Sequence, residues 1–148
     1  MVDILSPEER SRLMARIGPK GSRPELRVQA ALEELGIPFR THAKDLPGTP
    51  DFVLDHLHAV IFVHGCFWHR HPGCRYAYTP RSRVDFWQNK FIQNVRRDRR
   101  VARRLRAHGW SVITIWECGT RDTDRLRNLL RRRISRVRSG RHLRDGPR

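Results

Sequence analysis

The chain has 148 residues, with 31 lysines and arginines against 15 aspartates and glutamates, which gives a formal net charge of +16. Such a charge favours a polyphosphate partner, above all nucleic acid, with an acidic membrane surface as the competing partner. No apolar stretch approaches the roughly 18 residues of a membrane-spanning helix, and no secretory signal pattern is present, so neither a membrane nor a secreted protein is expected. The length suits one domain, which we place at residues 1–138.

Two helices are expected near the N-terminus. The run 6–17 begins with a capping serine, a proline and two acids, and we expect it to form the helix of an N-terminal arm, residues 1–20. Ser22 and Glu25 have the spacing of a capping box, so they should open a second helix that Gly36 ends.

The remaining elements alternate between short apolar strands and basic helices. In chain order we expect a strand (37–42), a hairpin of two strands (52–54 and 59–63), a loop (65–82), a basic amphipathic helix (83–108), a strand (110–116) and an arginine-rich helix (122–138). Residues 139–148 have the composition of a disordered basic tail. This order predicts an α/β fold in which helices cover the faces of one sheet.

Four side chains have the chemistry of a structural zinc site. Cys66, His71 and Cys74 lie in one loop after the apolar strand 59–63, and Cys118 follows the last strand. If these two strands are parallel neighbours, their ends bring the four side chains together. Three thiolates and one imidazole complete a closed tetrahedral Zn²⁺ site, which would hold the loop rather than do chemistry.

Two points at this site stay open on spacing alone. The cysteines could instead be small buried apolar residues, although Cys74 lies in a Pro-Gly turn and Cys118 precedes Gly119, neither of which is typical of a core. The nitrogen ligand could be His69 as well as His71. An odd number of cysteines without a secretory signal argues against a disulfide scaffold and for a reducing, cytoplasmic compartment.

Carboxylates suited to a second, oxygen-rich metal site occur at three places. Asp51 stands at the head of the strand 52–54, and Asp98 lies on the apolar stripe of the helix 83–108. A carboxylate on such a stripe must be paired, metal-bound or protonated, and a buried Asp–Arg or Asp–His pair is an equal alternative to metal binding. Glu25 is also acidic, but its capping position accounts for it structurally.

Phosphodiester hydrolysis needs a hard ion such as Mg²⁺ and benefits from a general base near neutral pH. His64 and His69 offer such bases, although each could equally be a hydrogen-bonded loop residue. Phe67 and Trp68 lie in a polar loop beside a basic surface, where they could stack on DNA bases or merely cover the zinc site.

The motifs resemble those of the very-short-patch repair endonucleases. They are Pro-Asp-Phe-Val at 50–53, Val-Ile-Phe-x-His-Gly-Cys-Phe-Trp-His at 60–69, Asn-Val-x-Arg-Asp-Arg-Arg at 94–100 and Gly-Trp-x-Val-x-x-x-Trp-Glu-Cys at 109–118. The resemblance extends from about Arg10 to Cys118. It implies a restriction-endonuclease-like mixed β-sheet and a bacterial, nucleoid-associated enzyme. Such an enzyme nicks one strand of duplex DNA at a T·G mismatch that arises when 5-methylcytosine deaminates.

The resemblance also implies roles for single residues. Asp51 is the metal-binding aspartate, His69 the general base, His64 and Asp98 supporting active-site residues, and Glu25 a more distant acid. Other implied roles are zinc ligation by Cys66, His71, Cys74 and Cys118, and insertion into the base stack by Phe67, Trp68 and, from a DNA-contacting N-terminal arm, Met14.

The chain departs from the family pattern at two places. Val63 stands where members carry threonine, although its backbone carbonyl can still coordinate Mg²⁺, and the zinc loop has Pro72-Gly73 before Cys74, one residue more than usual. We expect a monomer that acts on double-stranded DNA, with mismatch-repair proteins as candidate partners. Two other functions fit the residues less fully: a non-catalytic, zinc-stabilised DNA-binding protein, and a nuclease of related fold that acts on unmodified DNA in defence.

Overall fold

A computed structural model describes residues 23–144, and the α/β prediction is confirmed there. Its elements are α2 (Arg23–Glu34), β1 (Arg40–Thr41), β2 (Phe52–Leu54), the 3₁₀ turn η1 (Asp55–Leu57), β3 (Ala59–His64), α3 (Val84–Ala107), β4 (Ser111–Trp116), the 3₁₀ turn η2 (Glu117–Thr120) and α4 (Thr123–Arg144). The expected helix at 6–17, the arm at 1–20 and Met14 lie outside the described residues.

The four strands form one mixed sheet in the order β1-β2-β3-β4. The predicted hairpin is present, since β2 and β3 pair antiparallel. Strands β3 and β4 pair in parallel from Ala59 opposite Ser111 to His64 opposite Trp116. Both therefore end at the same edge of the sheet, and the segments that follow them start side by side.

The first strand is shorter than predicted, because β1 spans only two of the residues 37–42. Pro38 has no backbone N–H with which to extend the ladder at one end. At the other end His42 adopts a left-handed backbone conformation, with φ of 49°, that a strand cannot contain.

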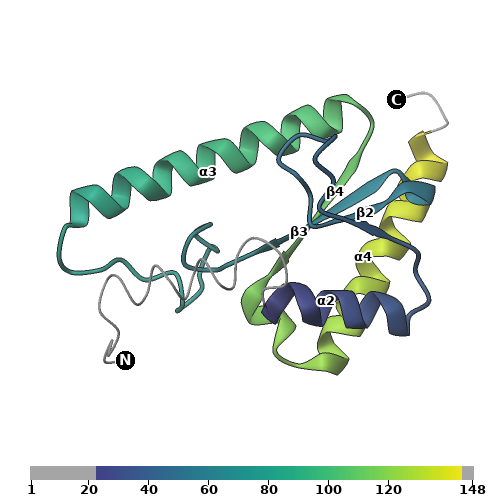
Figure 1. The fold of residues 1–148 in the computed structure, drawn as a ribbon, viewed down its shortest axis with the longest axis horizontal. Helices are drawn as coiled ribbons and strands as arrows, with labels where there is room; N and C mark the ends of the chain where they lie inside the picture. The colour runs from purple at the N-terminus through teal and green to yellow at the C-terminus, as the bar shows by residue number, and fades with distance from the viewer. Residues whose placement is uncertain (1–22, 145–148) are drawn as a thin grey trace.

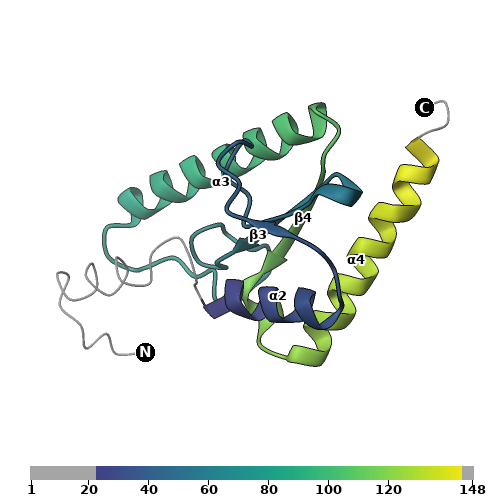
Figure 2. The same cartoon turned by 45° about the vertical axis from the view of Figure 1, so that its right-hand side comes forward.

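Helices cover both faces of the sheet, with α3 on one face and α2 and α4 on the other (Figures 1 and 2). The alternation of side chains along β3 explains this arrangement, because Ala59 and Ile61 join the core under α2 and α4, whereas Val60 and Phe62 join the core under α3. The sheet is thus buried on both faces, and its edge where β3 and β4 end is left for polar side chains.

The last helix is longer than predicted. Helix α4 runs to Arg144, so the segment expected to be disordered from Ser139 onward begins as helix. Its buried residues Leu126, Leu130 and Ile134 repeat every four positions, and arginine, a good helix former, fills half of the exposed positions whose burial is described. Over the span from 23 to 144, no helix has the length and apolarity needed to cross a bilayer.

The loop between β1 and β2 is held against α3. Gly48 has a φ of 73°, and a side chain there would overlap Val101 of α3. The backbone N–H groups of His42 and Ala43 donate to the carbonyls of Asp51 and Pro50 at 3.1 and 3.3 Å. These contacts fix the position of Asp51 at the beginning of β2.

Candidate active site and metal centre

The predicted active-site residues lie together at the edge where β3 and β4 end. Asp51 precedes β2, which is antiparallel to β3, so it lies beside the last residues of β3. The backbone N–H of Val63 donates to Asp51 Oδ2 at 2.7 Å. His64 is the final residue of β3, and His69 follows it in the adjoining loop.

Asp51 belongs to a cluster with Glu25 of α2 and His42. One ligand atom from each of these residues lies within 4.8 Å of the others. His42 Nε2 and Glu25 Oε2 are 3.1 Å apart, and Glu25 is buried, with 9% of its surface exposed. Burial is the main reason why the pKa of Asp51 is raised to about 7; the Glu25 carboxylate also raises this pKa, whereas the hydrogen bond from the Val63 N–H lowers it. Two carboxylates in such contact need a shared proton or a cation.

A second cluster consists of His64, His69 and Asp98. His69 Nδ1 and Asp98 Oδ2 are 2.7 Å apart, so the Asp–His alternative for Asp98 is the one the structure contains. The imidazole of His64 stacks on that of His69, with ring centroids 3.9 Å apart and an angle of 6° between the planes. Burial, followed by the nearby charge of His69, lowers the pKa of His64 to about 4, so His64 is neutral at pH 7.

The four predicted zinc ligands converge. One ligand atom from each of Cys66, His71, Cys74 and Cys118 lies within 4.8 Å of all the others, and it is His71 rather than His69 that joins the thiols. His71 Nδ1 lies 3.7 Å from Cys66 Sγ and 3.4 Å from Cys118 Sγ. Adjacent S and N ligands of a tetrahedral zinc ion lie about 3.5 Å apart, so the arrangement fits this ion.

The pKa values of two of these thiols are shifted in opposite directions. Burial raises the pKa of Cys66 to about 12, whereas the backbone N–H of Tyr76 lowers the pKa of Cys74. A bound cation would offset the cost of ionising the buried Cys66 thiol. His71 is held in place by Trp116 of β4, on which it stacks at a centroid distance of 4.3 Å.

The loop aromatics meet the first turns of α3. Phe67 lies edge-on to Trp68, Trp87 and Phe91 at centroid distances of 5.1 to 5.6 Å. Phe91 is buried, whereas Trp68 remains 41% exposed. Phe67 is therefore part of a local aromatic core, and Trp68 presents its surface to solvent.

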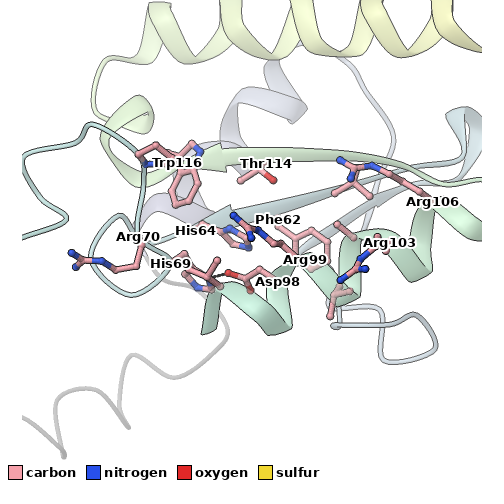
Figure 3. A pocket seen from close by; sticks show the side chains of 15 residues that line it. Phe62, His64, His69, Arg70, Asp98, Arg99, Arg103, Arg106, Thr114 and Trp116 are labelled. Carbon is pink, nitrogen blue, oxygen red and sulfur yellow. Dashed lines mark hydrogen bonds and ion pairs between the residues drawn. The ribbon is translucent and has the colours of Figure 1, made fainter. Parts of the chain in front are cut away.

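A groove of about 730 Å³ leads away from the paired His69 and Asp98 on the α3 face of the sheet. Figure 3 shows these two side chains joined at one end of the groove, with Arg99, Arg103 and Arg106 following along α3. Arginines spaced by one helical turn offer successive contacts to a chain of phosphates. The groove thus combines an imidazole–carboxylate pair with an anion-binding wall.

Comparison with known proteins identifies the family. The model for the family described as DNA mismatch endonuclease Vsr matches residues 2–75. The DNA mismatch endonuclease Vsr of Escherichia coli is 41% identical over 126 residues, which are 85% of this chain and 80% of that protein. This chain belongs to the Vsr family of DNA mismatch endonucleases.

Other relatives agree with this assignment. The type II nicking enzyme V.XorIIP of Xanthomonas oryzae is 48% identical over 88% of this chain and 98% of its own length. Among solved structures, the catalytic domain of the homing endonuclease I-Bth0305I superposes with a TM-score of 0.56, covering 79% of this chain and 98% of that one. At 22% identity that likeness concerns the fold alone, where it supports the expected endonuclease architecture.

Within this Vsr-family chain, two residues escaped the sequence analysis. His42 was considered only as the end of a strand, yet its side chain contacts Glu25. Arg70 holds the loop 65–82 together, because its guanidinium donates to the carbonyls of Ala77 and Tyr78 at 2.7 and 2.9 Å and lies 3.9 Å from the Phe91 ring. Arg70 stands between His69 and His71, which is a signal in the sequence, whereas His42 has no predicted site residue beside it, and the spacing of neither residue assigns it a partner.

Proposed function

We propose that this endonuclease makes a Mg²⁺-dependent single-strand nick at T·G mismatches that arise from deamination of 5-methylcytosine. The observation that carries the proposal is the convergence of Asp51 and the His69–Asp98 pair at one edge of the sheet, next to the cysteine cluster. The family assignment supports DNA as the substrate, and the net charge of +16 suits a phosphate backbone.

The carboxylates at this edge fit a divalent cation. Asp51 is in contact with the buried carboxylate of Glu25, and their mutual repulsion favours a positive ion between or beside them. In this proposal Asp51 and the backbone carbonyl of Val63 bind Mg²⁺, while Glu25 lies next to them. The ion supplies charge neutralisation for the phosphate and a lower pKa for water.

His69 is assigned the proton transfer. Its Nδ1 is engaged by Asp98, so Nε2 is the nitrogen that takes a proton from the attacking water, and the carboxylate stabilises the imidazolium that results. His64 stacks on this ring and, being neutral at pH 7, adds no competing charge. Asp98 and His64 are thus positioning residues for the general base.

The cysteine cluster is assigned to a structural Zn²⁺ ion. With four protein ligands its coordination would be closed, so it would fix the loop 65–82 against the end of β4 rather than activate water. Because His69 lies in that loop, this anchoring sets the position of the general base.

Recognition of the mismatch is assigned to the aromatic side chains. Trp68 is exposed and backed by the ring of Phe67, an arrangement suited to entering a base stack next to a weak T·G pair. Met14 would insert from the N-terminal arm, which lies outside the described residues. We further propose that the enzyme acts as a cytoplasmic, nucleoid-associated monomer, with mismatch-repair proteins as candidate partners.

The test compares a T·G duplex with a matched duplex, each incubated with purified protein in Mg²⁺ or in EDTA. The proposal predicts one nick, on one strand, in the T·G duplex with Mg²⁺ only. Double-strand cleavage of the matched duplex would indicate a defence nuclease instead, and binding without any cleavage would indicate a DNA-binding protein.

A further inference from the structure

We propose that His42 and Glu25 bind the divalent ion at the Asp51 centre together with Asp51, and that the imidazole of His42 makes the site prefer Mn²⁺ over Mg²⁺. The inference rests on the proposed function in so far as Asp51 binds the divalent ion there. It assigns His42 to the metal site and gives that site a mixed nitrogen and oxygen donor set.

Both the side chain and the backbone of His42 contact the two acidic residues. Its side-chain Nε2 lies 3.1 Å from Glu25 Oε2, and its backbone N–H donates to the carbonyl of Asp51 at 3.1 Å. Ligand atoms of all three residues lie within 4.8 Å of one another. A nitrogen and an oxygen about 3 Å apart suit either a hydrogen bond or two adjacent ligands of one octahedral ion.

The backbone at His42 is unusual for a residue with a side chain. Its φ of 49° lies in the left-handed region, which glycine or asparagine normally occupies. The imidazole is half-buried among the carboxylates instead of extending into solvent. A histidine therefore occupies a backbone conformation that disfavours residues with a bulky side chain.

The donor set decides which ion is preferred. Mg²⁺ demands oxygen ligands in near-ideal octahedral geometry and retains its waters, so an imidazole adds little to its binding. Divalent transition metals accept imidazole, and Mn²⁺ also suits carboxylates. Two carboxylates and one imidazole are thus a better match for Mn²⁺.

The experiment measures ion binding directly on the full chain, with the cysteine site saturated by one equivalent of Zn²⁺. Free Mn²⁺ is followed by its EPR signal, and Mg²⁺ is titrated as a competitor. The proteins compared are wild type, His42→Gln and, as a control, His58→Gln. Glutamine reaches the Nε2 position and can still donate to Glu25, but it offers an amide in place of a ring nitrogen. His58 also has a left-handed backbone, with φ of 50°, and lies at the other end of β3.

We expect wild type to bind Mn²⁺ at least about tenfold more tightly than Mg²⁺, and His42→Gln to lose roughly tenfold in Mn²⁺ affinity with little change for Mg²⁺. His58→Gln should match wild type. An unchanged Mn²⁺ to Mg²⁺ ratio in a folded His42→Gln protein would overturn the role of His42 while leaving the proposed function intact. Failure of wild type to bind either ion would overturn both.

A second measurement does not depend on the folding of the His42→Gln variant. Pulsed EPR of Mn²⁺ bound to wild type should show modulation from a coordinated imidazole nitrogen, and the modulation should persist in His69→Gln. Absence of the modulation in wild type, or its loss in His69→Gln, would overturn the assignment of His42 as the ligand.

Discussion

The contact between His69 and Asp98 yields a quantitative prediction for Asp98→Asn. The 2.7 Å distance and the low exposure of both side chains, 24% each, describe a charge-assisted hydrogen bond. Such a bond contributes about 1.5–3 kcal/mol, and the asparagine keeps its shape but not its charge. If this energy stabilises the imidazolium in the transition state, the rate of nicking should fall roughly 10- to 150-fold.

The assay is single-turnover nicking of an end-labelled T·G duplex at saturating enzyme, with the affinity for the same duplex measured separately in EDTA. We expect the rate to fall and the affinity to stay within about threefold, because Asp98 is assigned to the chemical step alone. Asp85→Asn, an exposed change in the first turn of the same helix, is the matched control and should nick like wild type. A folded Asp98→Asn protein with a wild-type rate would refute the assignment of His69 as an Asp98-held base.

Three further predictions concern the cysteine cluster, the exposed Trp68 and the groove along α3. Cys118→Ser should lose bound zinc and about 3 kcal/mol of stability, roughly 10 °C in melting temperature; unchanged zinc content by elemental analysis would contradict this. Trp68→Ala should weaken binding of a T·G duplex roughly 10- to 100-fold and of matched DNA far less, and equal losses in fluorescence anisotropy would argue against stacking. Replacing Arg103 and Arg106 with glutamine should make the slope of log affinity against log salt shallower by about 1.8 on any duplex, whereas an unchanged slope would place the DNA elsewhere.

Much of the fold followed from local patterns in the sequence. The two apolar strands around a short turn predicted the hairpin of β2 and β3, and the step of three or four residues on α3 placed Asp98 on the inward face. Element ends were less predictable, because α4 runs to Arg144, beyond the buried Ile134 and the partly buried Val137, so neither the apolar pattern nor a stop signal marks its end.

The candidate site was predictable where its residues adjoin strand ends and unpredictable where they meet across the fold. The approach of Cys118 to Cys66 required only that β3 and β4 be parallel, which the sequence allowed but did not dictate. Spacing could not choose between His69 and His71, because that choice depends on the turns of the loop. Glu25 and His42 are 17 residues apart and meet only through tertiary packing, so no periodic pattern links them.

The joint action of Asp51 and His69 is tested by the rate at which Asp51→Asn nicks a T·G duplex in Mg²⁺. Asparagine can still accept the hydrogen bond from the Val63 N–H, so the edge of the sheet should keep its structure while the site loses a charged metal ligand. We expect a rate lowered by on the order of a thousandfold with unchanged affinity for the duplex in EDTA. Nicking by this variant within about tenfold of the wild-type rate would contradict the central claim that Asp51 and His69 act together on one phosphate.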